Sequence, residues 1–286
     1  MTHLKDYFSL VKFSHTAFAL PFALIGYTAG VLAVGFDPWV LVGVLGCMVF
    51  ARNAAMGFNR LIDRRFDAEN PRTAGREIPA GKISPRAAGW FVGVNAAAFV
   101  TVAGMFNLLT LCLSPVVLLV VLGYSYTKRF TALCHLVLGL GLATAPSAAY
   151  IAVTGSLAGA MVGLSVLVFT WVAGFDIIYA LQDIDFDRSE RLHSIPAALG
   201  VRGALRVSGG LHVVTVAMVV WLGWLLPLSA AFYWVGAGLF LALLGYQHGI
   251  VRPGDLSKIG PTFGLTNGLA SFLYAVFVIL GLISSR

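Results

Sequence analysis

The chain has 286 residues, of which 59% are hydrophobic and only 11% are charged. About a quarter of the residues in a soluble domain are charged, so this composition and a mean hydropathy of +0.88 exclude that class and favour a membrane protein. The net charge of +7 follows from where the basic residues lie along the chain, and we expect no nucleic acid to bind.

Nine apolar segments are long enough to cross a lipid bilayer. A membrane-spanning helix needs about 20 mainly apolar residues. The segments of that length are 15–35, 39–58, 87–105, 108–126, 133–153, 160–180, 203–226, 230–248 and 263–283. Because they occupy most of the chain, we expect an all-α, polytopic membrane protein in which residues 1–286 form one domain embedded in lipid.

Basic residues lie almost entirely on one side of these segments. Those on the charged side are Lys5, Lys12, Arg60, Arg64, Arg65, Arg72, Arg76, Lys82, Arg86, Lys128, Arg129, Arg188, Arg191, Arg202, Arg206, Arg252 and Lys258. The loops that carry none are 35–38, 106–107, 154–159 and 226–229. Arg52 falls inside the second segment and Arg286 on the other side. This positive-inside pattern predicts a protein of the inner (cytoplasmic) membrane with a cytoplasmic N-terminus and an outside C-terminus.

Two acidic clusters follow the second and sixth segments, both on the predicted cytoplasmic side. The first cluster is Asn59, Asp63 and Asp67, and the second is Asp176, Asp183 and Asp187. Residues four or seven apart share one face of a helix, so each cluster is expected to present paired carboxylates on one stripe. Like charges at this spacing destabilise a helix, and acids near a membrane are costly. Both pairs therefore call for a compensating cation.

The chemistry of these side chains favours magnesium as that cation. Oxygen ligands without histidine or cysteine suit a hard ion, Mg²⁺ before Zn²⁺. In proteins Mg²⁺ commonly bridges one or two carboxylates to the phosphates of a substrate. Arg72, Arg76 and Lys128 lie close to the acids in sequence or at a neighbouring helix end. Together these residues predict a diphosphate held by metal ions and basic side chains at the membrane surface.

Two other interpretations remain open at this point. The acids could be solvated charges that offset the nearby arginines. They could also belong to a cation-coupled or proton-coupled transporter, in which acidic residues occur inside the membrane. A transporter would need acids near the middle of its spans, and only Asp176 lies at any depth.

Five features, in this order along the chain, resemble those of the UbiA-type membrane prenyltransferases. NRLIDRRFD resembles the family's NxxxDxxxD motif, RTAGREIPAGKIS its arginine-containing loop, YSYTKR its Tyr-x-x-x-Lys signature, YALQDIDFD its second acidic motif, and Asn267 an asparagine of its last helix. The stretches KFSHTAFALPF, NPRTAGREIPAG and GFDIIYALQD are most similar to the 4-hydroxybenzoate polyprenyltransferase branch, which includes the naphthoate prenyltransferases of the futalosine route.

The resemblance implies nine transmembrane helices around a central cavity and a reaction at the membrane. A polyprenyl group would pass from an allylic polyprenyl diphosphate to an aromatic acid of the 4-hydroxybenzoate or dihydroxynaphthoate type, in quinone biosynthesis. The alternatives within the family are other acceptors, namely homogentisate, haem or a lipid. The lipid bilayer would take up the polyprenyl tail.

The spacing and the resemblance together give each candidate residue a role. Two Mg²⁺ ions are expected on Asp63, Asp67, Asp183 and Asp187, with Asn59 contacting a metal or the diphosphate. The expected substrate contacts are Arg72, Arg76 and Lys128 to the diphosphate, Tyr124 and Tyr179 to the allylic cation, and Arg129 or Asn267 to the acceptor's carboxylate. Asp176 completes the catalytic set.

One position departs from the family pattern. The family often has a glycine before LxSxP in the loop after the second acidic motif, and here Arg191 occupies that place in RSERLHSIP. This departure leaves the metal ligands in place but puts the shape and charge of the loop in question.

The charge pattern makes a direct prediction about topology. In a background without Cys47, Cys112 and Cys134, a new cysteine at 107 or 156 should react with an impermeant thiol reagent only from outside. A cysteine at 75 or 189 should react only from the cytoplasm. Reversed labelling of either loop pair would overturn the nine-segment topology.

Overall fold

The computed structural model describes residues 4–11, 18–226, 228–251, 256 and 259–285, and all regular structure in these ranges is helical. Eight helices are long and apolar enough to cross a membrane. They are α3 (Pro38–Ile62), α5 (Pro85–Gly104), α6 (Leu108–Thr127), α7 (Cys134–Thr154), α8 (Gly159–Tyr179), α10 (Ile195–Leu225), α11 (Ala230–Ile250) and α12 (Gly260–Ser284). With the shorter apolar helix α2 (Leu20–Val34), they match the predicted segments, so the prediction of an all-α, multi-pass membrane protein is confirmed.

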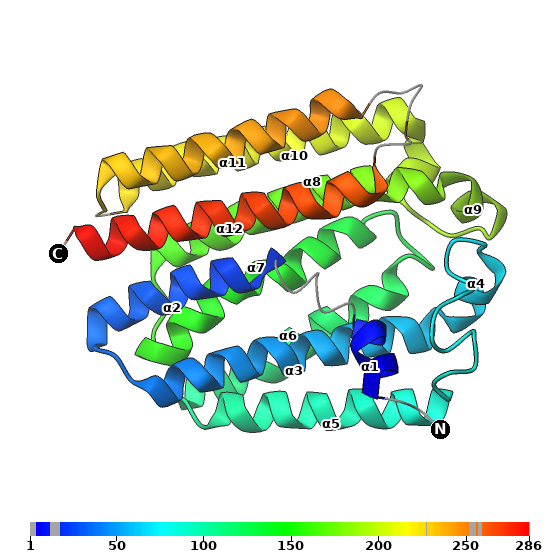
Figure 1. Ribbon diagram of the computed structural model, residues 1–286, viewed down its shortest axis with the longest axis horizontal. Coiled ribbons are helices and arrows are strands. Elements are labelled where there is room, and N and C mark those ends of the chain that lie inside the picture. The colour runs from blue at the N-terminus through cyan, green and yellow to red at the C-terminus, as the bar shows by residue number, and fades with distance from the viewer. Residues whose placement is uncertain (1–3, 12–17, 227, 252–255, 257–258, 286) are drawn as a thin grey trace.

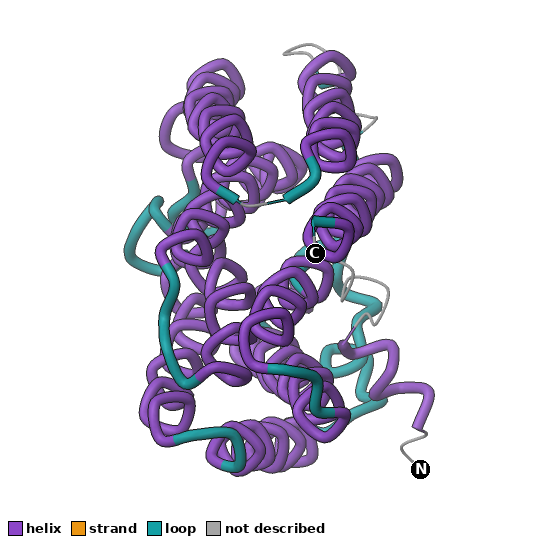
Figure 2. Tube along the Cα trace, turned by 90° about the vertical axis from the view of Figure 1, so that its left-hand side faces the viewer, coloured by secondary structure: helices purple, strands orange, loops and turns teal. Residues whose placement is uncertain are grey.

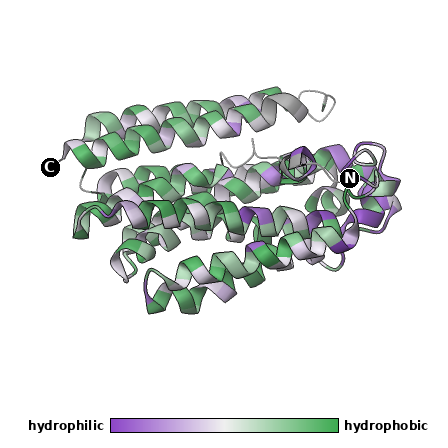
Figure 3. Ribbon diagram, turned by 60° about the horizontal axis from the view of Figure 1, so that its bottom comes forward, coloured by the Kyte–Doolittle hydropathy of each residue, from purple (hydrophilic) through white to green (hydrophobic). Residues whose placement is uncertain are grey.

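Polar residues gather at one end of this bundle. The short helices α4 (Arg64–Glu69) and α9 (Ile184–Ser189) lie together there, with the loops beside them (Figure 1). Figure 3 shows hydrophilic residues concentrated at the same end and mostly apolar long helices. We call it the polar end. The C-terminus lies at the opposite end (Figure 1).

The polar end contains the described parts of the loops that were predicted to be charged. Of the residues in that prediction, Lys12, Arg252, Lys258 and Arg286 lie outside the described residues. The side of the membrane that the polar end faces stays a prediction.

The helix α8 is the most deeply buried of the long helices and leads into the second acidic motif. It packs against both α7 and α10, and Figure 2 shows the long helices of the bundle nearly end-on. Trp171 on α8 is fully buried and its ring contacts those of Phe22, Phe175 and Phe240. From Trp171 to Ile178 every residue is buried except Asp176. The Asp176 carboxylate therefore opens onto the interior of the bundle.

The prediction that each acidic cluster lies on one continuous helix is wrong. The helix α3 ends at Ile62, and Asp63 has φ −87° and ψ 5° before α4 begins. Likewise α8 gives way to a 3₁₀ turn that ends at Asp183, before α9 begins. Each helix thus breaks at the first aspartate of its pair, where like charges four apart and the low helix propensity of aspartate oppose a regular helix.

The break at Asp63 is mild. Backbone N–H groups still donate from Asp63 to Asn59 at 2.9 Å and from Asp67 to Asp63 at 2.8 Å. The spacing of one helical turn is therefore kept, and the charge of Asp67 acts on Asp63.

The seventh long helix begins earlier than predicted. We expected it from residue 203, but α10 begins at Ile195, with Ser194 as its N-cap and Pro196 in its first turn. Both residues are helix-start signals. Our prediction used only the length of apolar segments, so it did not take them into account. A kink at Gly200, with φ 67°, separates this first turn from the rest of the helix.

The N-terminal helix α1 (Leu4–Val11) packs against the loop that follows α4. Leu10 is fully buried in a cluster with Ile78, Ile83 and Ala88. The Ser9 hydroxyl donates a hydrogen bond to Glu77 at 2.5 Å. This contact holds the arginine-containing loop at the polar end.

Candidate active site

Each of the four predicted metal-binding aspartates is paired with one basic side chain. The nearest nitrogen–oxygen distances are 3.4 Å for Arg129 and Asp63, 2.5 Å for Arg76 and Asp67, 2.6 Å for Arg72 and Asp183, and 2.6 Å for Lys128 and Asp187. All eight charged residues belong to the set predicted from sequence. The structure brings them together at the polar end as four acid–base pairs.

Three of these pairs join segments that lie far apart in the sequence, and only Arg76 and Asp67 are close together in it. Arg72 donates two hydrogen bonds to Asp183, 111 residues further along the chain. Lys128, from the turn after α6, pairs with Asp187 on α9, and its carbonyl oxygen accepts a hydrogen bond from the backbone N–H of His193 at 2.7 Å. The two acidic motifs and the Tyr-x-x-x-Lys signature therefore form one site.

The inner carboxylates are buried and incompletely satisfied. Asp187 is fully buried, and the Ser194 hydroxyl donates to its Oδ2 at 2.8 Å. Lys128 Nζ lies 2.6 Å from Oδ1 of Asp187, at an angle that makes no hydrogen bond. Asp67 Oδ1 accepts from Arg76, whereas its buried Oδ2 has no hydrogen-bond partner. Asp67 Oδ2 is therefore open to a cation, whereas Asp187 Oδ1 is held in an ion pair by Lys128.

Asp63 is the more open member of the first pair. The Asn59 side-chain amide donates to Asp63 Oδ2 at 2.9 Å. Burial, and then the neighbouring charge of Asp67, raises the pKa of Asp63 to about 6, while Arg129 opposes the shift. A raised carboxylate pKa means that the charged form is disfavoured as the site stands, so a bound cation would relieve the repulsion.

The donor set fits Mg²⁺ bound together with a phosphate ligand. In the part of the chain that the structure describes, no three histidine, cysteine or acidic side chains gather closely enough to hold a metal ion by themselves. A Mg²⁺ site needs only one or two carboxylates when substrate phosphates and water supply the other ligands. Asp63, Asp67, Asp183 and Asp187 are the residues that could hold it.

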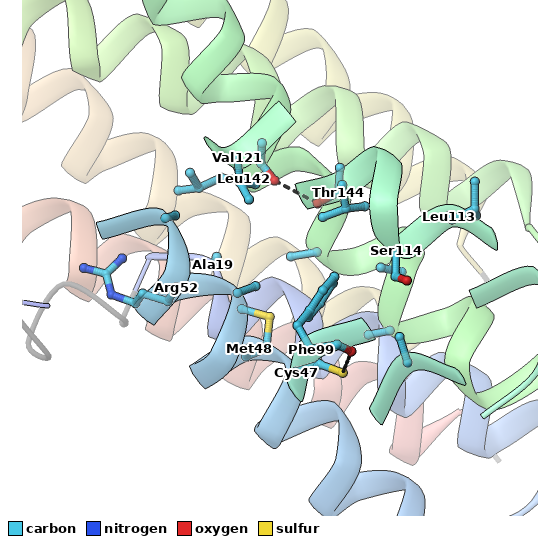
Figure 4. A pocket seen from close by; sticks show the side chains of 18 of the residues that line it. Ala19, Cys47, Met48, Arg52, Phe99, Leu113, Ser114, Val121, Leu142 and Thr144 are labelled. Carbon is cyan, nitrogen blue, oxygen red and sulfur yellow. Dashed lines mark hydrogen bonds between the residues drawn. The ribbon is translucent and has the colours of Figure 1, made fainter. Parts of the chain in front are cut away.

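An apolar cavity of about 200 Å³ lies between α3, α5, α6 and α7. Figure 4 shows its lining, with Arg52 toward one side and Leu113 and Ser114 toward the other. Tyr124 also lines the cavity and lies within electrostatic range of both Asp63 and Asp176. The bundle therefore contains the internal cavity that we expected, and Tyr124 in its wall feels the charge of the acidic site.

The other predicted residues occupy varied positions. Tyr179 lies within electrostatic range of Arg72. Asp176 is paired with His135, with 2.7 Å between Oδ2 and Nδ1. Asn267 is 1% exposed and accepts a hydrogen bond from Gln247 between α11 and α12. The structure therefore places Asn267 in a helix contact, and its role toward substrate stays a prediction.

Sequence reasoning gave no role to several residues that the structure places at the site. Arg52 and Arg60 are cationic residues of the apolar helix α3, and a charge inside an apolar segment is itself a signal of function. Ser194 caps α10 and also hydrogen-bonds to Asp187. Its S-x-P context is a cap signal, but its contact with Asp187 depends on tertiary packing.

Comparisons with known proteins agree with this arrangement. A profile of the UbiA prenyltransferase family matches residues 19–282. Over 250 residues the chain is 30% identical to a 4-hydroxybenzoate octaprenyltransferase of Aeromonas hydrophila, covering 85% of this chain and 84% of the relative.

Two solved structures have a similar fold. The apo structure of a UbiA homologue from Aeropyrum pernix superposes with a TM-score of 0.82 at 31% identity, covering 94% of this chain and 97% of that one. A UbiA homologue from Archaeoglobus fulgidus bound to GPP and Mg²⁺ superposes with a TM-score of 0.75 at 20% identity, covering 97% and 99%. The second similarity concerns the fold alone.

Arg191 shows why glycine is common at its position. It has φ 54° and is the one non-glycine residue with positive φ in the described part of the chain. The backbone N–H groups of Arg191 and Leu192 donate back to Arg188 and Asp187, at 3.4 and 2.8 Å. This is a Schellman ending of α9, which favours glycine at the left-handed residue. Arginine in place of glycine thus keeps the loop that holds Asp187, but it strains the backbone at Arg191.

We predict that Arg191→Gly is more stable than Arg191→Ala by about 1 kcal/mol, because only glycine adopts the left-handed conformation without strain. The alanine variant is the matched control, since both changes remove the same charge. Thermal unfolding of the two variants in detergent measures the difference. Equal stability would show that the left-handed turn at Arg191 is not under strain.

Proposed function

Because the chain belongs to the UbiA prenyltransferase family, we propose that it transfers a polyprenyl group from an allylic polyprenyl diphosphate to a hydroxylated aromatic acid. Membership of the family makes the chain a prenyltransferase and removes the transporter interpretation. The acceptor, the metal and the mechanism are the proposed part. The observation that carries the proposal is the set of four acid–base pairs at the polar end of a bundle whose apolar cavity is lined by an arginine.

The diphosphate would bind among the paired charges at the polar end. Bound Mg²⁺, with two ions proposed, would neutralise the diphosphate and assist its departure as a leaving group. The pairs Asp63–Asp67 and Asp183–Asp187 would hold the metal. In support, the structure of the Archaeoglobus fulgidus homologue contains Mg²⁺ together with GPP, a prenyl diphosphate.

The basic side chains would act on the leaving group. As the allylic C–O bond breaks, its electron pair stays on the diphosphate. Arg72, Arg76 and Lys128 already lie at the acids, and positioned cations stabilise the charge that develops. Tyr124 on the cavity and Tyr179 near Arg72 are the aromatic faces that would stabilise the allylic cation.

Arg52 is the best candidate to hold the acceptor's carboxylate. It lines the cavity on α3, whereas Arg129 lies at the mouth, paired with Asp63 and packed over the rings of Phe66 and Tyr126. A carboxylate on Arg52 would place the ring of a small aromatic acid inside the cavity. The name of the Aeromonas hydrophila relative, a 4-hydroxybenzoate octaprenyltransferase, supports an acceptor of this class.

Asp176 would take the proton that the ring loses. When the allylic carbon bonds to the ring, the ring C–H electron pair restores aromaticity and the proton leaves. Asp176 is the partly exposed acid in a buried stretch of α8, and His135 fixes its orientation at 2.7 Å. Its position within electrostatic range of Tyr124, which lines the cavity, supports this role.

The cavity also indicates where the polyprenyl tail would go. Its volume of about 200 Å³ suits an aromatic ring and the first part of a tail, and a long tail must extend into the bilayer.

We infer that the polar end faces the cytoplasm at the inner membrane, in line with the positive-inside pattern of the loops.

Replacing Asp63 with asparagine should lower magnesium-dependent prenyl transfer by at least about 100-fold, because one well-placed charge commonly contributes ~10²–10³ in rate. Asp187→Asn should lower it similarly, and it should also lower thermal stability because Lys128 loses its buried partner. Asp185→Asn, an exposed acid of α9, is the matched control and should stay near the wild-type rate. Near-normal activity in both Asp63→Asn and Asp187→Asn would exclude this site.

The acceptor proposal is tested by competition and by changing Arg52. 4-Hydroxybenzoate and dihydroxynaphthoates should compete for prenylation better than matching phenols without a carboxylate. Arg52→Gln should raise the acceptor KM about 10–100-fold, as expected for a lost charge-assisted hydrogen bond, and leave the KM for prenyl diphosphate nearly unchanged. Exposed Arg86→Gln is the control. A preference for the phenols, or an unchanged acceptor KM in Arg52→Gln, would contradict the proposal.

A further inference from the structure

Arg60 is a buried cation without a partner. It lies in the last turn of α3 and is 3% exposed. Within the part of the chain that the structure describes, its guanidinium makes no ion pair and its buried Nε has no hydrogen-bond partner. A buried charge without compensation is strongly unfavourable, so this side chain needs an anion that the protein itself does not supply.

The position of Arg60 indicates where that anion would lie. Met48, Arg52 and Met56 line the cavity at intervals of four residues along α3, and Arg60 follows at the same interval, toward the polar end. Residues at this interval share a helix face. Tyr124, which also lines the cavity, lies within electrostatic range of Arg60. Arg60 is therefore at the boundary between the cavity and the acidic site.

The nearby acids are already engaged elsewhere. Asp67 and Glu77 both lie within electrostatic range of Arg60. Asp67 is held by Arg76, and Glu77 accepts a hydrogen bond from Ser9. Asp67 Oδ2 is nevertheless buried without a partner, like Arg60 Nε. Asp67 and Arg60 thus lie near each other without forming a pair. Asp67 can therefore accept a bound cation, and Arg60 can bind an anion.

We propose that Arg60 binds the phosphate of the prenyl diphosphate that is bonded to the allylic carbon. This inference rests on the proposed function. A metal–diphosphate complex would satisfy both Asp67 and Arg60, and the cavity side of the acids is where the allylic end of the substrate must enter. As the allylic C–O bond breaks, the electron pair remains on an oxygen of this phosphate, and Arg60, which stays protonated, stabilises that oxygen.

Three variants test this role. Arg60→Met removes the charge from an unbranched side chain, Arg60→Lys keeps the charge, and Arg65→Gln changes an exposed arginine of the neighbouring α4. Arg60→Met should raise the thermal unfolding temperature of the protein without ligands, because a buried cation without a partner is removed. It should weaken binding of inorganic diphosphate with Mg²⁺ about 10–100-fold and lower kcat about 100-fold. Arg60→Lys should recover part of the diphosphate affinity and part of kcat, and Arg65→Gln should behave as wild type.

The direct measurement is calorimetric titration of inorganic diphosphate and Mg²⁺ into each variant, which needs no turnover. Unchanged diphosphate affinity in Arg60→Met would overturn the proposal, and a lower unfolding temperature with that unchanged affinity would show a structural role instead. A raised acceptor KM with unchanged diphosphate affinity would also overturn it, since the anion would then be the acceptor's carboxylate. If the wild type binds diphosphate but transfers no prenyl group to any acceptor, the proposed function fails while the Arg60 test still stands.

Discussion

Mutual neutralisation of four aspartates and four basic side chains is the constraint on which the rest of the site depends. Buried or half-buried carboxylates at the edge of a membrane are unfavourable unless each has a partner, and here the partners are the cations expected to bind diphosphate. Adding a metal alone would free the bases, and adding a diphosphate alone would free the acids. Among the states with a bound ligand, only the one with both would leave every charge compensated, so the site is suited to a metal–diphosphate complex.

The fold makes this charge pairing possible because it brings three distant segments to one end of the bundle. The loop after α4 supplies Arg72 and Arg76, the turn after α6 supplies Lys128 and Arg129, and the segment after α8 supplies the second acidic pair. The bundle beneath them contains the apolar cavity, with Arg52 and Tyr124 in its wall. In the proposed reaction, the diphosphate would bind at the paired charges and the aromatic ring in the cavity, so leaving group and acceptor would approach the allylic carbon from different directions.

Sequence patterns predict the spans and the acidic motifs because both depend on short-range periodicity and composition. The pairing of charges from different segments depends on tertiary packing and leaves no local signal in the sequence. Arg72 and Asp183, for example, lie 111 residues apart. The helix breaks at Asp63 and Asp183 arise where charge repulsion and the low helix propensity of aspartate oppose a regular helix. The strained turn at Arg191 is different, since a family preference for glycine already indicates a left-handed residue. Sequence places Arg52 inside an apolar segment and Arg60 just after it. Only the structure shows that Arg52 lines a cavity and that, among the described residues, the buried Nε of Arg60 has no hydrogen-bond partner.

Thermal unfolding of the detergent-solubilised protein with Mg²⁺ alone, with inorganic diphosphate alone and with both tests the charge balance most directly. A ligand that binds only the folded state raises the unfolding temperature, and coupling between two ligands appears as a shift beyond the sum of their separate shifts. Our account predicts small shifts with either ligand alone and a much larger shift with both, because each alone leaves one set of charges uncompensated. A full shift with Mg²⁺ alone, or shifts that simply add, would contradict it.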